Sequence, residues 1–383
     1  MKININGADA YLLSSESAHN ADMYYATGFL AHDPFIYLNS GNEKLLVSDM
    51  ELGRAKNESR IKDVIPTSQY GIMDKIRTFP DVETAYCEMI FEFLHSLNAK
   101  RIAVPYNFPV QTADCMRKAG FDVIPMKSPF REMREVKNEK EIAAIQKAQR
   151  AGEKALEEGI KAIKNATIKN DMLIHDNNPL TTETVRAIIE RALLSYGCEA
   201  PDIIIACGRG SSDPHWQGEG DLLANEPIVI DMVPRSKKER YYSDMTRTVM
   251  RGTPGEELKE MFEAVLESQK AALKKIKAGI TGSDVHNIVC EVLEEIGFET
   301  ARGKSGIFTE GFIHSTGHGV GLDIHEGPSL SESGKELKAG NVVTVEPGLY
   351  FKDLGGVRLE DVVIVTKTGC KNLTMFEKNL VLK

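Results

Sequence analysis

The sequence has little of what several large protein classes require. Its six cysteines are scattered and include no CxxC pair, which argues against a thiolate zinc site or a disulfide framework and favours buried, reduced thiols. No apolar run approaches the roughly eighteen residues of a membrane span, and the first residues contain no apolar core of signal-peptide length. We therefore expect a cytoplasmic protein with no membrane partner.

An excess of basic residues is also absent. The chain has 47 lysine and arginine residues against 56 aspartate and glutamate residues, a formal net charge of -9. Because nucleic-acid binders normally carry a basic excess or stripe, we expect no nucleic-acid partner. What is present, 42% hydrophobic and 27% charged residues, is typical of a globular protein. At 383 residues the chain is longer than the usual single core, so two domains are expected.

The first part of the chain mixes short apolar strands with helices. The residues Ser40-Gly41-Asn42 are a hairpin turn signal between two of the strands. Strands are predicted at residues 9–15, 22–29, 35–40, 44–49 and 101–106, and helices at 81–97 and 111–118. This pattern predicts an α/β domain at residues 1–132, and it contains no reactive cluster.

A second domain, at residues 133–383, begins with a long helix. Asn138 and Glu141 have the spacing of a capping box, and apolar residues then mark one helical face as far as Ile163. The polar stretch 165–179 is predicted to be a loop or flap, and Thr181 or Thr182 can cap the next helix. Further strands are predicted at 202–208, 228–233, 241–249, 341–350 and 356–366, and further helices at 256–277 and 284–296.

Several of these strands contain acidic residues in apolar surroundings. Asp231 follows three β-branched residues, Glu346 lies in VVTVEPG, and Glu360 precedes the run VVIV. Taken singly, such residues more often cap turns or face solvent. A buried, unpaired carboxylate costs several kcal/mol, however, and several carboxylates that converge repel one another unless dications lie between them.

A cluster of three histidines lies close to these acids in the sequence, in HSTGHGVGLDIHE at residues 314–326. We interpret one histidine and four carboxylates as the ligands of two divalent metal ions, namely Asp231, Asp244, His318, Glu346 and Glu360. Such an oxygen-rich set suits Mn²⁺ or Co²⁺ best, while Zn²⁺ and Fe²⁺ also fit. A pair of metals about 3.5 to 4 Å apart generates the nucleophile of many hydrolases.

The motifs HSTGHGVGLDIHE, VEPGLY and GVRLED, in this order, resemble those of the creatinase and methionine aminopeptidase superfamily, peptidase family M24. The segment MYYATGF with the following FIYLNS resembles the N-terminal domain of its proline-specific branch. The resemblance covers most of the chain. It implies an α/β (α+β) architecture, with a creatinase-like N-terminal domain and a catalytic domain of the pita-bread fold.

The resemblance also implies a role for each matching residue. It makes Glu346 a general acid and base as well as a ligand, and it makes His215 and His325 the histidines that bind substrate and steady the tetrahedral intermediate. His314 matches a further histidine near the substrate. Tyr350 and Arg358 match residues that support the site from behind.

The function implied is hydrolysis of the bond before proline in a small peptide, by a homodimeric metallopeptidase with two divalent metal ions. The compact length favours a dipeptidase (prolidase), and the alternative is an Xaa-Pro aminopeptidase that acts on longer peptides. A metal-free creatinase-like enzyme or a binding module is less favoured, because all five ligand positions keep acidic or histidine residues. One departure is the spacing of Asp231 and Asp244, thirteen residues (244 minus 231), which is longer than usual in the family.

Overall fold

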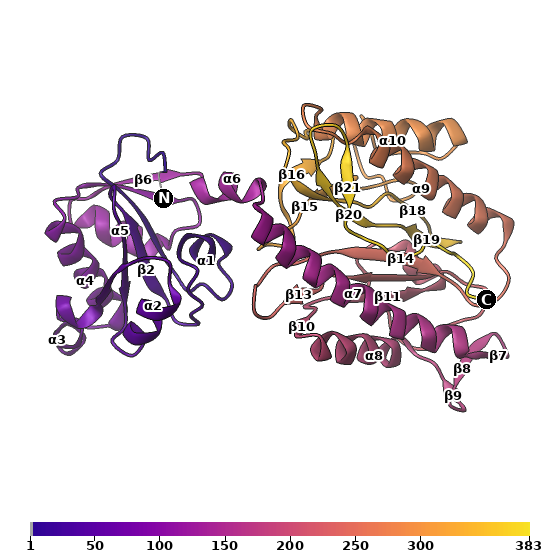
Figure 1. The fold of residues 1–383 in the computed structure, drawn as a ribbon, viewed down its shortest axis with the longest axis horizontal. Coiled ribbons are helices and arrows are strands. Elements are labelled where there is room, and N and C mark those ends of the chain that lie inside the picture. Colours follow the sequence, from indigo (N-terminus) through magenta and orange to yellow (C-terminus); the bar gives the residue numbers. More distant parts are fainter. Residues whose placement is uncertain (1–2) are drawn as a thin grey trace. The chain divides into compact units, whose positions relative to one another are not determined.

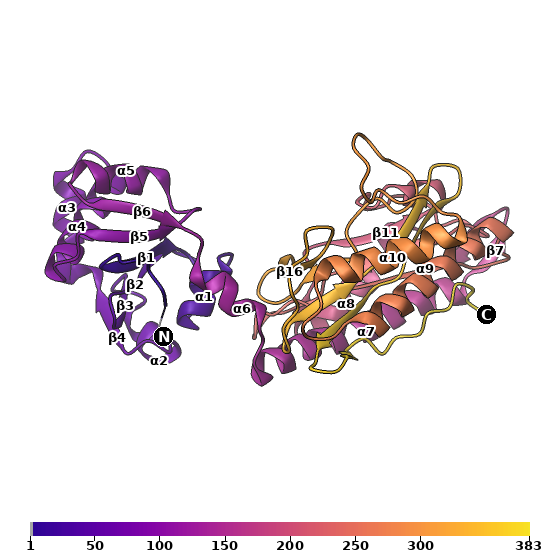
Figure 2. The same ribbon diagram turned by 90° about the horizontal axis from the view of Figure 1, so that it is seen from above.

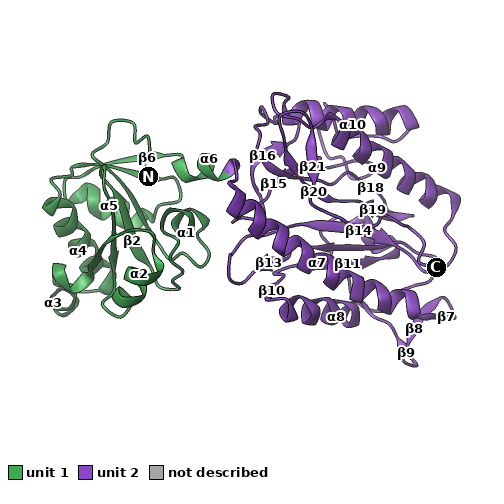
Figure 3. Cartoon of the chain, viewed as in Figure 1, with its two compact units in different colours: residues 1–134 green, residues 135–383 purple. Residues whose placement is uncertain are grey.

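The computed structural model describes residues 3–383 and divides into two compact units, residues 1–134 and 135–383 (Figure 3). The division falls two residues after the expected boundary at 132/133, inside helix α6 (Pro129–Glu135). Among the described residues, no helix is both long and apolar enough to cross a membrane.

The first unit is built on a six-stranded sheet in the order β4-β3-β2-β1-β5-β6 (Figure 1). The pairs β1/β2 and β2/β3 are antiparallel and the other three pairs are parallel, so the sheet is mixed. Apolar clusters cover both of its faces. The strands are β1 (Ala10–Ser15), β2 (Phe35–Asn39), β3 (Glu43–Val47), β4 (Asp63–Pro66), β5 (Arg101–Pro105) and β6 (Asp122–Met126).

The helices of this unit are α1 (Ala21–Thr27), α2 (Leu52–Glu58), α3 (Ile72–Thr78), α4 (Val82–Ser96) and α5 (Val110–Lys118), with a short 3₁₀ turn at Thr67–Tyr70. The predicted hairpin at 40–42 is confirmed, with Gly41 at a φ of 95°. The strand predicted at 22–29 is wrong, because this segment forms α1. Asn20 caps it by accepting the Met23 N–H, and Gly28 ends it in the left-handed region, so capping outweighs the strand propensity of the tyrosines.

The second unit contains four long helices in two pairs (Figures 1 and 2). Helix α7 begins with the predicted capping box, in which Asn138 and Glu141 each accept the other's backbone N–H. Thr181 caps the next helix, as predicted. The helices are α7 (Glu139–Asn165), packed against α8 (Thr182–Ser195), and α9 (Glu256–Lys275), packed against α10 (Gly282–Ile296).

Two larger sheets lie in this unit. One is antiparallel and has the order β11-β12-β14, and the other has the order β16-β15-β17-β20-β21. A separate hairpin is formed by β18 and β19. The strands are β11 (Ile203–Cys207), β12 (Ile228–Met232), β14 (Met245–Val249), β15 (Gly317–Gly319), β16 (Glu326–Leu330), β17 (Val342–Val345), β18 (Gly348–Phe351), β19 (Gly355–Arg358), β20 (Asp361–Val365) and β21 (Cys370–Asn372).

The stretch 165–179 is not the irregular loop that we predicted. It forms a three-stranded antiparallel sheet of β7 (Thr167–Lys169), β8 (Met172–His175) and β9 (Asn178–Pro179). Its tight turns are Asn170-Asp171 and Asp176-Asn177, and all four residues have positive φ. Asn and Asp tolerate this conformation, which two-residue hairpin turns require, so the polar composition indicated turns within a sheet.

Two predicted strands are each broken in two. The segment 341–350 divides into β17 and β18, with Glu346 and Pro347 between them, and the segment 356–366 divides into β19 and β20, with Leu359 and Glu360 between them. At the first break the chain passes from the five-stranded sheet to the β18/β19 hairpin, and at the second break it returns to that sheet. Pro347 contributes to the first break because it has no N–H to donate to a ladder. The charged turn predicted at 234–240 is held at its start by a short antiparallel strand pair, β10 (Cys198–Glu199) with β13 (Arg235–Ser236).

Candidate metal centre

The three-stranded sheet brings two aspartates to one end of neighbouring strands. Asp231 lies in β12 opposite Thr246 of β14, and Asp244 immediately precedes β14. Paired residues on adjacent strands point to the same face, as do alternate residues of one strand, so Asp231, Thr246 and Asp244 share one face of the sheet.

The five-stranded sheet contributes a histidine and two glutamates. His318 is the central residue of β15, and a Cβ at the preceding Gly317 would lie 2.1 Å from the Thr344 carbonyl oxygen, so this close strand crossing requires glycine. Glu346 follows β17 and Glu360 precedes β20. These strands pair with Val345 opposite Asp361. Both strand breaks therefore place a glutamate at the same end of the sheet.

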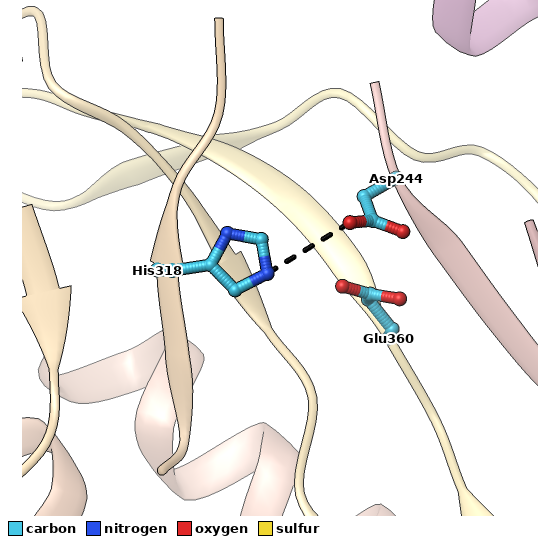
Figure 4. Close-up of side chains that lie close together, drawn as sticks. All are labelled: Asp244, His318 and Glu360. Carbon is cyan, nitrogen blue, oxygen red and sulfur yellow. Dashed lines mark ion pairs between the residues drawn. The ribbon is translucent and has the colours of Figure 1, made fainter. Parts of the chain in front are cut away.

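All five side chains line one cavity of about 610 Å³ in the second unit. His318 Nε2 lies 3.3 Å from Glu346 Oε1 and 3.8 Å from Asp244 Oδ2. Figure 4 shows the imidazole facing Asp244 and Glu360 across the site. One donor atom from each of Asp244, His318 and Glu360 lies within 4.8 Å of the others, an arrangement that could hold a metal ion.

The carboxylates of this centre carry more negative charge than the neighbouring cationic side chains neutralise. Burial raises the pKa of Glu346 to about 7, and it raises the pKa values of Asp244 and Glu360 well above their usual range, with mutual repulsion as a second cause. Among residues 3–383, the one guanidinium that donates to these carboxylates is that of Arg358, whose Nη2 donates to Asp231 Oδ2 at 2.6 Å. A set of buried carboxylates with this excess of negative charge fits divalent cations.

His318 has the protonation state that a ligand needs. Its Nδ1–H donates to the Gly319 carbonyl oxygen at 3.0 Å, which leaves the Nε2 lone pair facing the carboxylates. Burial lowers the pKa of His318, so the neutral imidazole is favoured. The ring of His325 packs on it edge to face, with centroids 4.3 Å apart.

The remaining predicted site residues also line the cavity, except Tyr350, which lies behind it. The Tyr350 hydroxyl accepts from Arg358 Nη1 at 2.7 Å and lies 2.9 Å from His314 Nε2, while His314 Nδ1 lies 2.7 Å from the Ser315 carbonyl oxygen. Both ring nitrogens of His314 therefore have partners. His215 is exposed, in a turn where its backbone N–H donates to Asp213 Oδ1 at 3.0 Å.

This geometry agrees with comparisons between the chain and known proteins. Residues 143–367 match the sequence profile of metallopeptidase family M24, and residues 2–136 match that of the creatinase/prolidase N-terminal domain. The first of these matches covers more than half of the chain. The chain belongs to metallopeptidase family M24. The metallopeptidase class and the creatinase-like and pita-bread folds expected from the sequence are thereby confirmed.

Relatives match this M24 protein over nearly its full length. A Xaa-Pro dipeptidase of Pyrococcus horikoshii is 32% identical and covers 98% of this chain and 95% of its own length. A crystal structure of the prolidase from Pyrococcus horikoshii superposes with a TM-score of 0.79 at 30% identity, covering 98% of this chain and 96% of its own. An X-Pro aminopeptidase from Thermotoga maritima gives a TM-score of 0.78 at 28% identity, covering 98% of both chains.

Two threonines of this M24 site were missed in the sequence. Thr246 Oγ1 donates to Glu360 Oε2 at 2.8 Å, and Thr344 Oγ1 donates to Glu346 Oε1 at 3.3 Å. Each lies two residues from a predicted ligand, Asp244 and Glu346 respectively. Because alternate residues of a strand share a face, this spacing was the signal that could have found them.

Two buried residues behind the M24 site were also missed. Arg247 donates from Nη1 to the carbonyl oxygens of Thr246 at 2.9 Å and Glu360 at 2.6 Å, and from Nη2 to Asp361 Oδ1 at 3.0 Å. His286 of α10 lies 3.0 Å from the hydroxyl of Thr316, whose carbonyl accepts the Glu346 N–H. These contacts join residues far apart in the sequence, so no local sequence pattern predicts them.

Proposed function

We propose that this M24 protein is a prolidase, which hydrolyses the bond between a residue and a following proline in dipeptides. The observation that carries the substrate class is the likeness to a Xaa-Pro dipeptidase over 98% of the chain, N-terminal unit included. A cavity of about 610 Å³ is a suitable size for a small peptide.

Two divalent metal ions are the proposed cofactors, held by Asp231, Asp244, His318, Glu346 and Glu360. The buried, undercompensated carboxylates of this set support the proposal. Its four carboxylates and one imidazole favour Mn²⁺ or Co²⁺ over Zn²⁺ or Fe²⁺. When bound, such ions supply Lewis acidity and lower the pKa of water.

Glu346 is the proposed general base and acid. Its carboxylate faces the cavity and the Thr344 hydroxyl holds one of its oxygens. It would take a proton from the attacking water and pass it to the proline nitrogen, which leaves as a secondary amine. Thr344 keeps the carboxylate oriented for both steps.

The histidines at the cavity wall are proposed to act on the substrate. His215 and His325 are exposed to the cavity and can donate to the substrate carbonyl as negative charge develops on its oxygen. His314 has no free ring nitrogen, so its proposed role is to shape the pocket wall and to hold the Tyr350 hydroxyl. Arg358 would orient Asp231 and Tyr350 together.

The test is hydrolysis of an Xaa-Pro dipeptide and an Xaa-Pro-Y tripeptide, side by side, by metal-stripped protein refilled with Mn²⁺, Co²⁺ or Zn²⁺. We expect cleavage of the dipeptide, fastest with Mn²⁺ or Co²⁺. Cleavage of the tripeptide alone would make the protein an Xaa-Pro aminopeptidase. Cleavage of neither, with metal bound, would overturn the substrate class.

We further propose that the protein is a cytoplasmic homodimer and that the boundary between its two domains in the sequence falls after residue 132. The dimer rests on the family resemblance, and the compartment rests on the six cysteines, all of which are free thiols in the described part of the chain. Sedimentation equilibrium tests the dimer. Limited proteolysis between the two units tests the boundary.

A further inference from the structure

One carboxylate of the cavity takes no part in the proposed metal centre. Asp202 lines the cavity from the residue just before β11, and its side chain is exposed. Gln217 Nε2 donates to its Oδ1 at 3.0 Å, and Gln217 lines the same cavity. Within residues 3–383, Asp202 forms no ion pair with a lysine or arginine. The nearby Arg186 guanidinium donates to the carbonyl oxygens of Ile203 and Gln217 and not to Asp202, so the Asp202 carboxylate is available to a ligand.

The strand fixes where this charge lies relative to the metal centre. Ile203 and Ile205 are buried in the core, so Ile204 and Asp202 face the cavity on the alternate side. Ile204 pairs directly with Asp231 of β12, and Asp202 is two residues further along, about 7 Å away. Val233, the residue after the end of β12, also lines the cavity. In the antiparallel register it lies on the same side of Asp231 as Asp202 does. The side chains of Ile204 and Val233 thus form an apolar floor of the cavity between the metal centre and the Asp202 carboxylate.

An Xaa-Pro dipeptide has three places for a charge: the amino group, the carboxylate and the side chain of Xaa. Asp202 would repel the carboxylate. The amino group is two bonds from the scissile carbonyl carbon, so it must stay beside the metal centre and cannot reach Asp202. A long side chain on Xaa crosses the apolar floor, and a cationic group at its end would meet the carboxylate.

We propose that Asp202 selects a lysine or arginine side chain on the residue before proline. This inference rests on the proposed prolidase activity and names the class of dipeptide that the site prefers. Ile204 and Val233 would contact the methylene groups of the side chain, and Gln217 would hold the Asp202 carboxylate in place. Because the pair is partly exposed, the preference should weaken as ionic strength rises.

The experiment compares two pairs of dipeptides that differ in charge and little in shape: Arg-Pro with citrulline-Pro, and Lys-Pro with norleucine-Pro. We expect kcat/KM to be about three- to ten-fold higher for the charged member of each pair in the wild-type protein at low salt. Asp202→Asn should bring both ratios close to one, whatever its absolute rates. Glu219→Gln is the matched control, since Glu219 is an exposed carboxylate two residues after Gln217 that does not line the cavity, and it should keep the ratios.

A charge reversal provides a second arm. Asp202→Lys should prefer Glu-Pro to Gln-Pro, a preference that the wild-type protein should lack. Equal rates for Arg-Pro and citrulline-Pro in the wild-type protein, or a ratio that survives in Asp202→Asn, would overturn the role of Asp202. Failure to cleave any of these dipeptides would instead overturn the proposed prolidase function, so the two failures are distinguishable.

Discussion

At the scale of single residues, three of the four carboxylates of the site, Asp231, Glu346 and Glu360, accept a hydrogen bond from a neighbouring side chain. Thr246 holds Glu360, and Arg358 holds Asp231. The sequence indicated the carboxylates because an acid within an apolar strand needs a cation. Thr246 was missed because threonine is a common strand residue, although its place two residues from Asp244 puts the two side chains on one face.

The first prediction concerns the proposed general base. Glu346→Gln should lower kcat at least about a hundred-fold, because an amide cannot accept a proton from the attacking water. The measurement is dipeptide hydrolysis under saturating metal, with metal content determined on the same sample. A near-normal kcat in this variant would contradict the assigned role.

The second prediction concerns a supporting hydroxyl. Thr246→Val keeps the shape of the side chain and removes the donor to Glu360 Oε2, so metal affinity should fall about ten-fold or more. Titration of the metal-stripped protein with Mn²⁺ measures this. Thr246→Ser keeps the hydroxyl and should stay close to the wild-type affinity. Equal losses in both variants would point to packing instead of the hydrogen bond.

The third prediction concerns pH and His314. Burial lowers the pKa of this imidazole from 6.5 to about 4. Between these values the unfolded chain binds a proton that the folded chain does not, so the free energy of unfolding should fall as pH drops from about 6.5 to about 4. Thermal unfolding across this range, compared with His314→Asn, measures the effect. In the variant, the slope of the free energy of unfolding against pH should fall by the amount that corresponds to about one bound proton. An unchanged slope would exclude His314 as its source.

At the scale of elements, the sequence predicted most helices and strands but not where two strands break. Residues 341–350 and 356–366 look like continuous strands because their apolar patterns run unbroken. The breaks at Glu346 and Glu360 arise because the chain passes between two sheets there. That exchange depends on tertiary packing, which a local pattern does not contain. Helix α1 was missed for a different reason: its capping residues Asn20 and Gly28 are visible in the sequence, but its tyrosines led us to predict a strand.

Arg247 connects elements of the two larger sheets from behind the site. It lies in β14, and its guanidinium reaches the Glu360 carbonyl and the Asp361 carboxylate at the start of β20. Both side chains of this ion pair are 1% exposed. Lys378 Nζ also donates to Asp361, at 2.5 Å. The Arg247–Asp361 ion pair therefore holds the segment that contains Glu360 against β14, the strand that follows Asp244.

The fourth prediction follows from this contact. Arg247→Met should destabilise the second unit by about 3 to 5 kcal/mol, because it leaves a buried carboxylate with one cation fewer. Chemical denaturation with a probe in the second unit measures the loss. Adding Asp361→Asn should recover part of it by removing the unpaired charge. No recovery in the double variant would mean that the backbone contacts of Arg247, and not the ion pair, provide the stability.

At the scale of the whole molecule, every proposed metal ligand lies in the second unit, residues 135–383. The first unit has its own mixed sheet and its own apolar clusters. Length and composition predicted two domains, and the motifs predicted that the chemistry belongs to the second. The preference for a particular Xaa depends on which side chains line the cavity, and those come from segments that no single motif spans.

The fifth prediction separates the two units by metal removal. A chelator should lower the unfolding temperature of the second unit, because its buried carboxylates then repel one another, while the first unit should unfold as before. Differential scanning calorimetry with and without chelator, followed by Mn²⁺ addition, measures both transitions. A downward shift of both transitions, or of neither, would contradict this division.

The order of the ligands along the chain has a consequence for how metal is acquired in the cell. Asp231 and Glu360 are 129 residues apart (360 minus 231). At typical rates of protein synthesis, about 6 to 26 s pass between the making of the first ligand and the last. The complete ligand set can therefore form only after this interval, so metal is taken from what the cell then supplies. The ion in a purified sample should therefore reflect the metal supply of the growth medium, and manganese- and cobalt-supplemented cultures should yield protein of different metal content.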